Sequence, residues 1–103
     1  METMKYYAEL AAIHPGEILR EEYLKPLGLS AGGLAKRLGV PRTRIERLIS
    51  EETSVTVDTA LRLARFFGTS PDLWMSMQTG YDFKIAQVEK AEALRAIVPL
   101  EAA

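Results

Sequence analysis

The chain has 103 residues, of which 48% are hydrophobic and 26% are charged, and its formal net charge is −1. This length allows one domain with a modest core, and the composition argues against disorder over most of the chain. The chain has no cysteine, no apolar run near the roughly 20 residues that span a bilayer, and no N-terminal signal pattern. These features exclude a disulfide framework and a thiolate zinc site, and we expect a cytoplasmic protein without a membrane partner.

Changes in residue pattern divide the chain into three parts. Residues 1–13 have neither a turn signal nor a clean hydrophobic period, and we expect an N-terminal extension there. Residues 14–90 are expected to form a helical domain with a dimerising last helix. Residues 91–103 are expected to form a C-terminal tail, in which Pro99 ends any helix.

The first helix is predicted to begin at His14-Pro15-Gly16-Glu17, because a proline at the first helical position loses no hydrogen bond. Leu19, Tyr23 and Leu27 recur every four residues, which is typical of a buried helix face. Gly28 predicts the C-terminal end of this helix. The histidine has no second ligand or nucleophile near it in the sequence, so we interpret it as a helix-start residue.

Two short amphipathic helices are predicted on either side of a turn at Gly39-Val40-Pro41. The first of them follows Ser30, which is a good N-cap, and its inward face is formed by Leu34, Ala35 and Leu38. Glycine in the turn allows a positive φ at little cost.

The second of these helices is predicted from about Arg42 to Ser50. At 100° per residue, Ile45, Leu48 and Ile49 share one face of it, which we expect to be buried. The side chains on the opposite face are those of Thr43, Arg47 and Ser50.

Two longer helices complete the predicted domain. Thr56 caps a fourth helix that ends at Gly68. Its predicted buried stripe consists of Val57, Ala60, Leu61, Ala64 and Phe67. Ser70-Pro71-Asp72 begins a fifth helix with a cap, a first-position proline and an acidic first turn.

The apolar stripe of the fifth helix is longer than a small core requires. It consists of Trp74, Met77, Tyr81, Ile85 and Val88. Such a stripe at helical spacing is typical of a core or of a homodimer seam, and we prefer this interpretation to a ligand pocket.

The charge between Ser30 and Ser50 indicates a function. This segment has five Lys or Arg residues and one acidic residue, Glu46, although the whole chain is slightly acidic. A bracing helix, a short turn and a second helix with a basic outer face are typical of a helix-turn-helix. In that motif the second helix enters the major groove of DNA.

Four segments in a characteristic order carry a family resemblance. They are His14-Pro15-Gly16-Glu17-Ile18-Leu19, Leu38-Gly39-Val40-Pro41-Arg42, Asp58-Thr59-Ala60-Leu61-Arg62-Leu63-Ala64 and Phe67-Gly68-Thr69-Ser70, with Trp74 and Tyr81-Asp82 beyond them. On these segments, residues 14–85 resemble the lambda-repressor-like (Xre) family and, within it, the HigA-type antitoxins. The resemblance implies an all-α fold, a five-helix lambda-repressor-like DNA-binding domain with the helix-turn-helix at its second and third helices.

The same resemblance implies a function. The protein would be the DNA-binding antitoxin of a type II toxin–antitoxin pair, a homodimer that binds an inverted repeat of double-stranded DNA in its own promoter. It would repress its operon and neutralise a RelE-like, ribosome-dependent ribonuclease toxin. The toxin follows from the resemblance alone. The alternatives are a free-standing Xre regulator without a toxin, and a protein-interaction module that has lost DNA binding.

The chain departs from the family pattern at two places. Ala31 stands where family members often carry a glutamine that touches the DNA backbone. Ser50-Glu51-Glu52-Thr53 replaces an Asn-Gly-Lys/Arg turn that adds phosphate contacts. Each lost phosphate contact lowers the salt slope of binding by about 0.9. We therefore expect weaker DNA binding than the family norm, and its loss if both glutamates lie against phosphate.

The candidate DNA-binding residues are Ser30, Lys36, Arg42, Thr43, Arg44, Arg47 and Ser50. Thr43 and Arg47 are predicted to face bases, since arginine pairs bidentately with guanine. Arg42 and Arg44 are predicted to contact the DNA backbone or the groove edge, and Arg42 can also reach bases in the family pattern. Lys36 is predicted to contact phosphate, with a solvated helix face as the alternative. We expect no enzymatic activity, no cofactor and no metal site.

Overall fold

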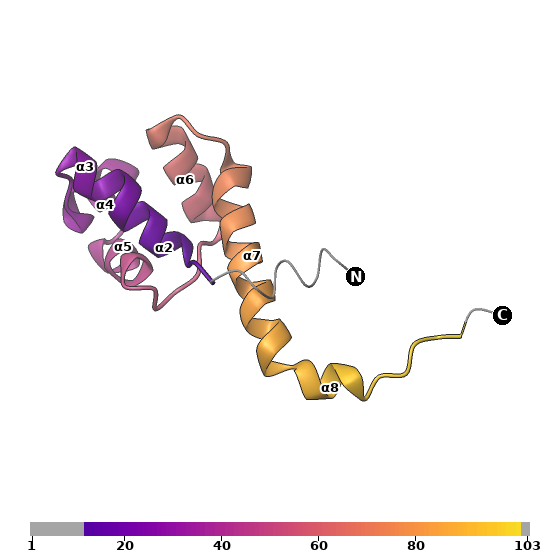
Figure 1. The fold of residues 1–103 in the computed structure, drawn as a ribbon. Coiled ribbons are helices and arrows are strands. Elements are labelled where there is room, and N and C mark those ends of the chain that lie inside the picture. Colours follow the sequence, from indigo (N-terminus) through magenta and orange to yellow (C-terminus); the bar gives the residue numbers. More distant parts are fainter. Residues whose placement is uncertain (1–11, 102–103) are drawn as a thin grey trace.

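The computed structural model describes residues 12–101, which form helices and connecting loops without a strand. Residues 1–11 of the predicted extension lie outside the described residues. In chain order the helices are α2 (Pro15–Ile18), η1 (Leu19–Leu24), α3 (Lys25–Leu27), α4 (Ala31–Leu38), α5 (Arg42–Ile49), α6 (Val57–Phe67), α7 (Pro71–Glu89) and α8 (Ala91–Arg95). Because α2, η1 and α3 are continuous, the five predicted helices are all present (Figure 1), and α8 adds a short helix within the predicted tail. The all-α, five-helix prediction is confirmed.

The first helix buries a different residue from the one predicted near its end. Leu24 is buried and Leu27 is 62% exposed. The middle of this helix, η1, is a π-helix, whose wider turn brings residues five apart onto one face. Leu24 therefore lies on the same buried face as Leu19. The prediction from a period of four was wrong at Leu27.

The helix-turn-helix forms where the sequence predicts it. The Ser30 hydroxyl accepts a hydrogen bond from the Gly33 amide at 3.0 Å and caps α4. Gly39 ends α4 at a φ of 72°, where a side chain would be strained. The predicted inward side chains of α4 are buried, as are Ile45 and Leu48 of α5.

Helix α6 is rotated relative to the prediction. Its buried residues are Thr59, Ala60, Leu63 and Ala64, whereas Val57 is 63% and Leu61 53% exposed. The predicted and the observed stripes share two alanines, and they differ in which leucine faces inward. The choice depends on the packing of α6 against both α4 and α7, which the sequence period does not contain.

Helix α7 is partly core and partly projecting. Trp74 is fully buried, and its ring centroid lies 5.2 Å from that of Tyr23, which itself lies 4.7 Å from that of Phe67. The Trp74 indole also donates a hydrogen bond to the Thr69 hydroxyl at 3.0 Å. Farther along, α7 extends past the other helices and leads into α8 and the C-terminal segment (Figure 1). Val88, in this projecting part, is 78% exposed.

Over the described range, none of the helices has the length and apolar content to cross a bilayer.

Candidate DNA-binding interface

The outer face of α5 carries the two predicted base-contacting residues, Thr43 and Arg47, and the candidate Ser50 is the C-cap of this helix. Thr43, Arg47 and Ser50 are exposed, on the side away from the buried Ile45 and Leu48. Among residues 12–101, no acidic side chain pairs with Arg47. Its guanidinium is therefore available to an external acceptor.

The two other arginines of α5 are paired within the protein. Arg42 lies 3.4 Å from Glu46, one turn farther along the same helix. Gly32 of α4 leaves room for this side chain, because a Cβ there would lie 3.0 Å from Arg42 Cδ. Arg44 donates a hydrogen bond to the Asp58 carboxylate of α6 at 2.6 Å.

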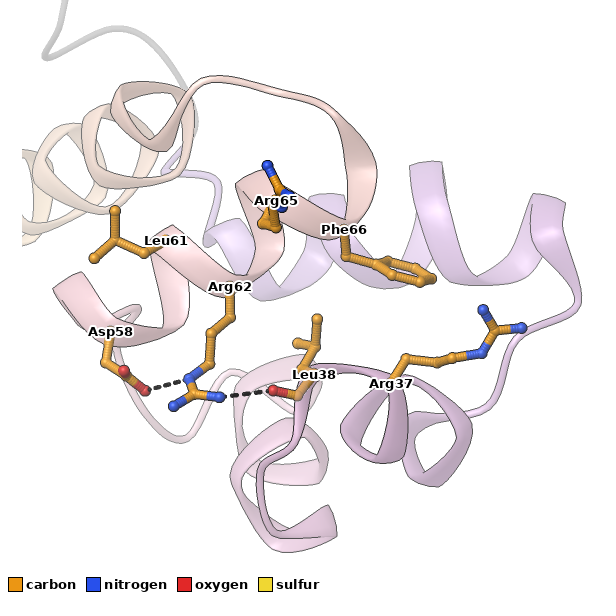
Figure 2. A pocket seen from close by; sticks show the side chains of 7 residues that line it. All are labelled: Arg37, Leu38, Asp58, Leu61, Arg62, Arg65 and Phe66. Carbon is orange, nitrogen blue, oxygen red and sulfur yellow. Dashed lines mark hydrogen bonds and ion pairs between the residues drawn. The ribbon is translucent and has the colours of Figure 1, made fainter.

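Asp58 also binds a second arginine. Arg62 donates to the same Asp58 oxygen at 3.0 Å and to the Leu38 carbonyl at 2.8 Å (Figure 2). Hydrogen bonds from Arg44 and then from Arg62 lower the pKa of the Asp58 carboxyl below its ordinary value. Arg62 thus joins α6 to the C-terminal end of α4 at the turn of the helix-turn-helix. The helical period, which leaves Arg62 outside the predicted buried stripe, did not indicate this role.

An open groove of about 580 Å³ lies between α4 and α6. Its lining residues are Arg37, Leu38, Asp58, Leu61, Arg62, Arg65 and Phe66 (Figure 2). The Arg37 guanidinium carbon lies 5.7 Å from the centroid of the Phe66 ring, close enough for a cation–π contact. Lys36, a predicted phosphate contact, is exposed at the position of α4 directly before Arg37.

The acidic loop after α5 is held by local and long-range contacts. Arg20 donates to the Ile49 carbonyl at the end of α5 and lies 3.4 Å from Glu51. The Ser50 hydroxyl donates to the Glu52 carboxylate at 2.6 Å. Glu51 itself has a φ of 66°, the left-handed conformation that favours glycine. The loop therefore keeps the backbone shape of a glycine turn, and its first glutamate is partly neutralised by Arg20.

These contacts and the fold can be compared with known proteins. The helix-turn-helix family matches residues 21–74, which is more than half of the chain and includes α4, α5 and α6. The chain belongs to the Xre-like helix-turn-helix family. The predicted resemblance to HigA-type antitoxins is confirmed as well.

Three relatives of this Xre-like chain illustrate the match. Virulence-associated protein I of Dichelobacter nodosus is 54% identical over 89% of this chain and 84% of its own length. Antitoxin HigA-1 of Vibrio cholerae is 31% identical over 82% of this chain and 80% of its own length. A structure described as Pseudomonas aeruginosa antitoxin HigA with higBA promoter superposes with a TM-score of 0.85 at 35% identity, covering 88% of this chain and 100% of that one.

The Xre-like domain depends on supporting residues that sequence reasoning missed. Gln78 of α7 is buried, accepts a hydrogen bond from the Val55 amide at 2.8 Å and donates to Asp82 at 2.9 Å. It therefore fixes the loop between α5 and α6. A polar residue four positions after Trp74, in an otherwise apolar stripe, was the available signal.

The first turn of the Xre-like domain packs against the end of α5. The ring of His14 is buried, and its Nδ1 accepts a hydrogen bond from the Gly16 amide at 2.9 Å, as the helix-start interpretation requires. A Cβ on Gly16 would lie 1.8 Å from the Leu48 carbonyl oxygen. Helix α5 is thus positioned by a backbone contact that only glycine permits.

Proposed function

We propose that this protein is a DNA-binding antitoxin that represses its own operon by inserting α5 into the major groove. The supporting observation is the exposed face of Thr43, Arg47 and Ser50, where the Arg47 guanidinium has no acidic partner among residues 12–101. It lies on the second helix of a helix-turn-helix, in a fold that matches an antitoxin HigA described with promoter DNA.

The proposed contacts divide into base readout and backbone positioning. Arg47 would pair with the O6 and N7 atoms of a guanine, which is worth about 1–3 kcal/mol of discrimination. Thr43 would lie beside it on the groove face. The other candidates, Ser30, Lys36, Arg44 and Ser50, would contact the DNA backbone or the groove edge and fix the register. Arg42 would do the same and could also reach a base.

The proposed DNA-binding unit is a homodimer. Ile85 and Val88 belong to the C-terminal half of α7 and are 36% and 78% exposed, which leaves an apolar surface that the described residues of one chain do not cover. Pairing these surfaces around a two-fold axis would cover them. The dimer would then present two α5 helices to half-sites about 34 Å apart on an inverted repeat.

The proposed protein partner is a RelE-like ribonuclease toxin. Its support is the membership of the chain among HigA-type relatives, two of which are described as antitoxins. An acidic surplus outside residues 30–50 suits a basic partner of this kind.

Substitution of Arg47 tests the base contact. Arg47→Ala should relax specificity at one position of each half-site, measured by comparing the Kd for the operator with that for single-mismatch operators. The matched control is Arg65→Ala, an exposed arginine on α6 without an acidic partner in the described range, which should leave that ratio unchanged. Equal weakening on matched and mismatched DNA would contradict base readout by Arg47 and leave the helix-turn-helix standing.

Co-purification tests the toxin. The protein should be expressed untagged with the tagged product of the neighbouring reading frame, and the molecular mass of the eluted complex determined. A stable complex with a small basic protein that is lethal when expressed alone supports the antitoxin. No complex, together with a specific shift of upstream DNA, would favour a free-standing Xre regulator. Loss of sequence-preferring binding at about 100 mM salt would favour an interaction module, since specific binding normally survives such salt.

A further inference from the structure

Asp58 lies where the recognition helix meets the helix that follows it. It is in the first turn of α6, and its carboxylate oxygen lies 2.6 Å from the Arg44 guanidinium of α5. Both side chains are about half exposed, at 54% for Asp58 and 41% for Arg44. The pair is therefore open to solvent and to any ligand that covers α5.

A second arginine holds the carboxylate in this place. Arg62 binds the same oxygen of Asp58 at 3.0 Å while it donates to the Leu38 carbonyl at 2.8 Å. Since Arg62 is anchored to the end of α4, the negative charge has a fixed position facing the flank of α5. Figure 2 shows Arg62 between these two acceptors.

The flank of α5 is where DNA phosphates would lie. An α-helix with its side chains is about 10–12 Å across, and the major groove is about 12 Å wide, so the flanking side chains of an inserted helix reach the groove walls. Arg44 is on such a flank, between the outer face and the buried face. A phosphate approaching it meets a guanidinium that already binds a carboxylate.

We propose that Asp58 is an intramolecular competitor for DNA phosphate at Arg44 and thereby sets the affinity of the protein for DNA of every sequence. This inference rests on the proposed DNA binding by α5. Because Asp58 cancels part of the charge of Arg44, it weakens the binding of the protein to operator and unrelated DNA alike. Arg47 has no acidic partner within the described range, and it carries the sequence discrimination separately.

The alternative role for Asp58 is to hold α5 and α6 together. An exposed ion pair contributes little to stability. The hydrogen bond from Arg62 to the Leu38 carbonyl does not involve Asp58 and also connects α6 to α4. The two roles differ in their readout. If Asp58 competes with phosphate, its substitution changes DNA affinity and the salt dependence of binding. If Asp58 holds α5 and α6 together, its substitution changes the midpoint of thermal unfolding.

The test is Asp58→Asn, with Kd measured by fluorescence anisotropy on the upstream operator duplex and on an unrelated duplex of equal length, over a series of salt concentrations. At about 0.1 M salt we expect binding to both duplexes to tighten about three- to tenfold, and the salt slope to steepen by about 0.9, equivalent to one more neutralised phosphate. The ratio of the two Kd values should not change.

Three further variants separate the competitor from other effects. Asp72→Asn makes the same charge change in the first turn of α7, where no arginine of the described residues contacts the carboxylate, and should alter Kd less than about twofold. Asp58→Glu keeps the charge and should bind as the wild type does. In an Arg44→Gln background, Asp58→Asn should lose its effect, because the arginine that it would release is gone.

Two results would overturn the inference. One is an Asp58→Asn protein that binds no more tightly than Asp72→Asn, and the other is a gain that persists without Arg44. Thermal unfolding of each variant checks that the fold is intact. If neither the wild type nor Asp58→Asn binds any duplex at low salt, the proposed DNA-binding function is wrong and the inference falls with it. If the wild type binds its operator specifically and Asp58→Asn leaves the Kd unchanged, only the competitor role of Asp58 is rejected.

Discussion

At the scale of single residues, polar groups inside this domain connect segments that are far apart in the chain. Gln78 binds the Val55 amide across 23 residues, and Arg20 binds the Ile49 carbonyl across 29. The Ile49 carbonyl is the last of α5, and the Val55 amide lies in the loop between α5 and α6. A buried backbone group without a partner costs about 1–3 kcal/mol, so these side chains stabilise the loop that begins where the recognition helix ends.

Replacement of Gln78 by leucine should destabilise the protein. Gln78→Leu is close in size but leaves the Val55 amide without its acceptor, and we expect a loss of about 1–3 kcal/mol in the free energy of unfolding, measured by urea denaturation. Thr79→Leu, at the exposed next position, is the control and should change stability by less than about 0.5 kcal/mol. Equal effects of the two substitutions would show that the buried hydrogen bond is not what stabilises this site.

At the scale of elements, close backbone approach determines how α2 and α5 pack. Gly16 faces the Leu48 carbonyl so closely that no Cβ fits between them. The π-helix η1 follows directly and turns Leu24 toward the core in place of Leu27. The first helix thus combines an irregular turn, which buries Leu24, with a glycine contact that seats its first turn against α5.

A pair of glycine substitutions tests this contact. Gly16→Ala should lower the free energy of unfolding by at least about 3 kcal/mol, since its Cβ would overlap a backbone oxygen that cannot move without shifting α5. Gly80→Ala lies in the middle of α7, where the added Cβ would meet no described atom within 4 Å beyond its chain neighbours and the local helix backbone. It should raise stability by about 0.5–1 kcal/mol. Calorimetry on both variants gives the comparison, and a Gly16→Ala protein as stable as the wild type would contradict the observed packing.

At the scale of the whole molecule, α7 serves two purposes. Its first half places Trp74 in the core, and its second half projects beyond the other helices with Phe83 63% and Val88 78% exposed. A 19-residue helix is about 28 Å long, which is more than the small core needs. We interpret the projecting half as the surface that a second copy covers.

A charge in this surface should weaken the proposed homodimer. Val88→Glu would bury a carboxylate in an apolar seam, and we expect the dimer dissociation constant to rise at least about tenfold, measured by analytical ultracentrifugation. Operator affinity should fall with it, because the two half-sites would be bound independently. Val57→Glu is the control, since Val57 is similarly exposed on α6, away from the projecting part of α7. A dimer that tolerates Val88→Glu as well as Val57→Glu must use another surface.

The sequence by itself determined the features that depend on a few neighbouring residues. Ser30, Thr56 and Ser70 were predicted as caps, and each hydroxyl accepts a hydrogen bond from an amide two or three positions later. Gly39 was predicted at the turn of the helix-turn-helix for its positive φ. Local hydrogen bonds and backbone preferences act over one helical turn, so the residue pattern contains them completely. The helix order, the motif and the outward direction of Arg47 followed from them.

Only the tertiary structure decided what depends on the packing of separate elements. It exposed Val57, Leu61 and Leu27, because the choice among apolar faces is made by the neighbouring helices. It also paired Arg44 with Asp58, at a separation of 14 residues. A sequence period gives the direction of a side chain around its own helix but not which partner stands opposite. The fold therefore decides whether an arginine of α5 has an acidic partner. Within the described residues Arg44 has one and Arg47 does not.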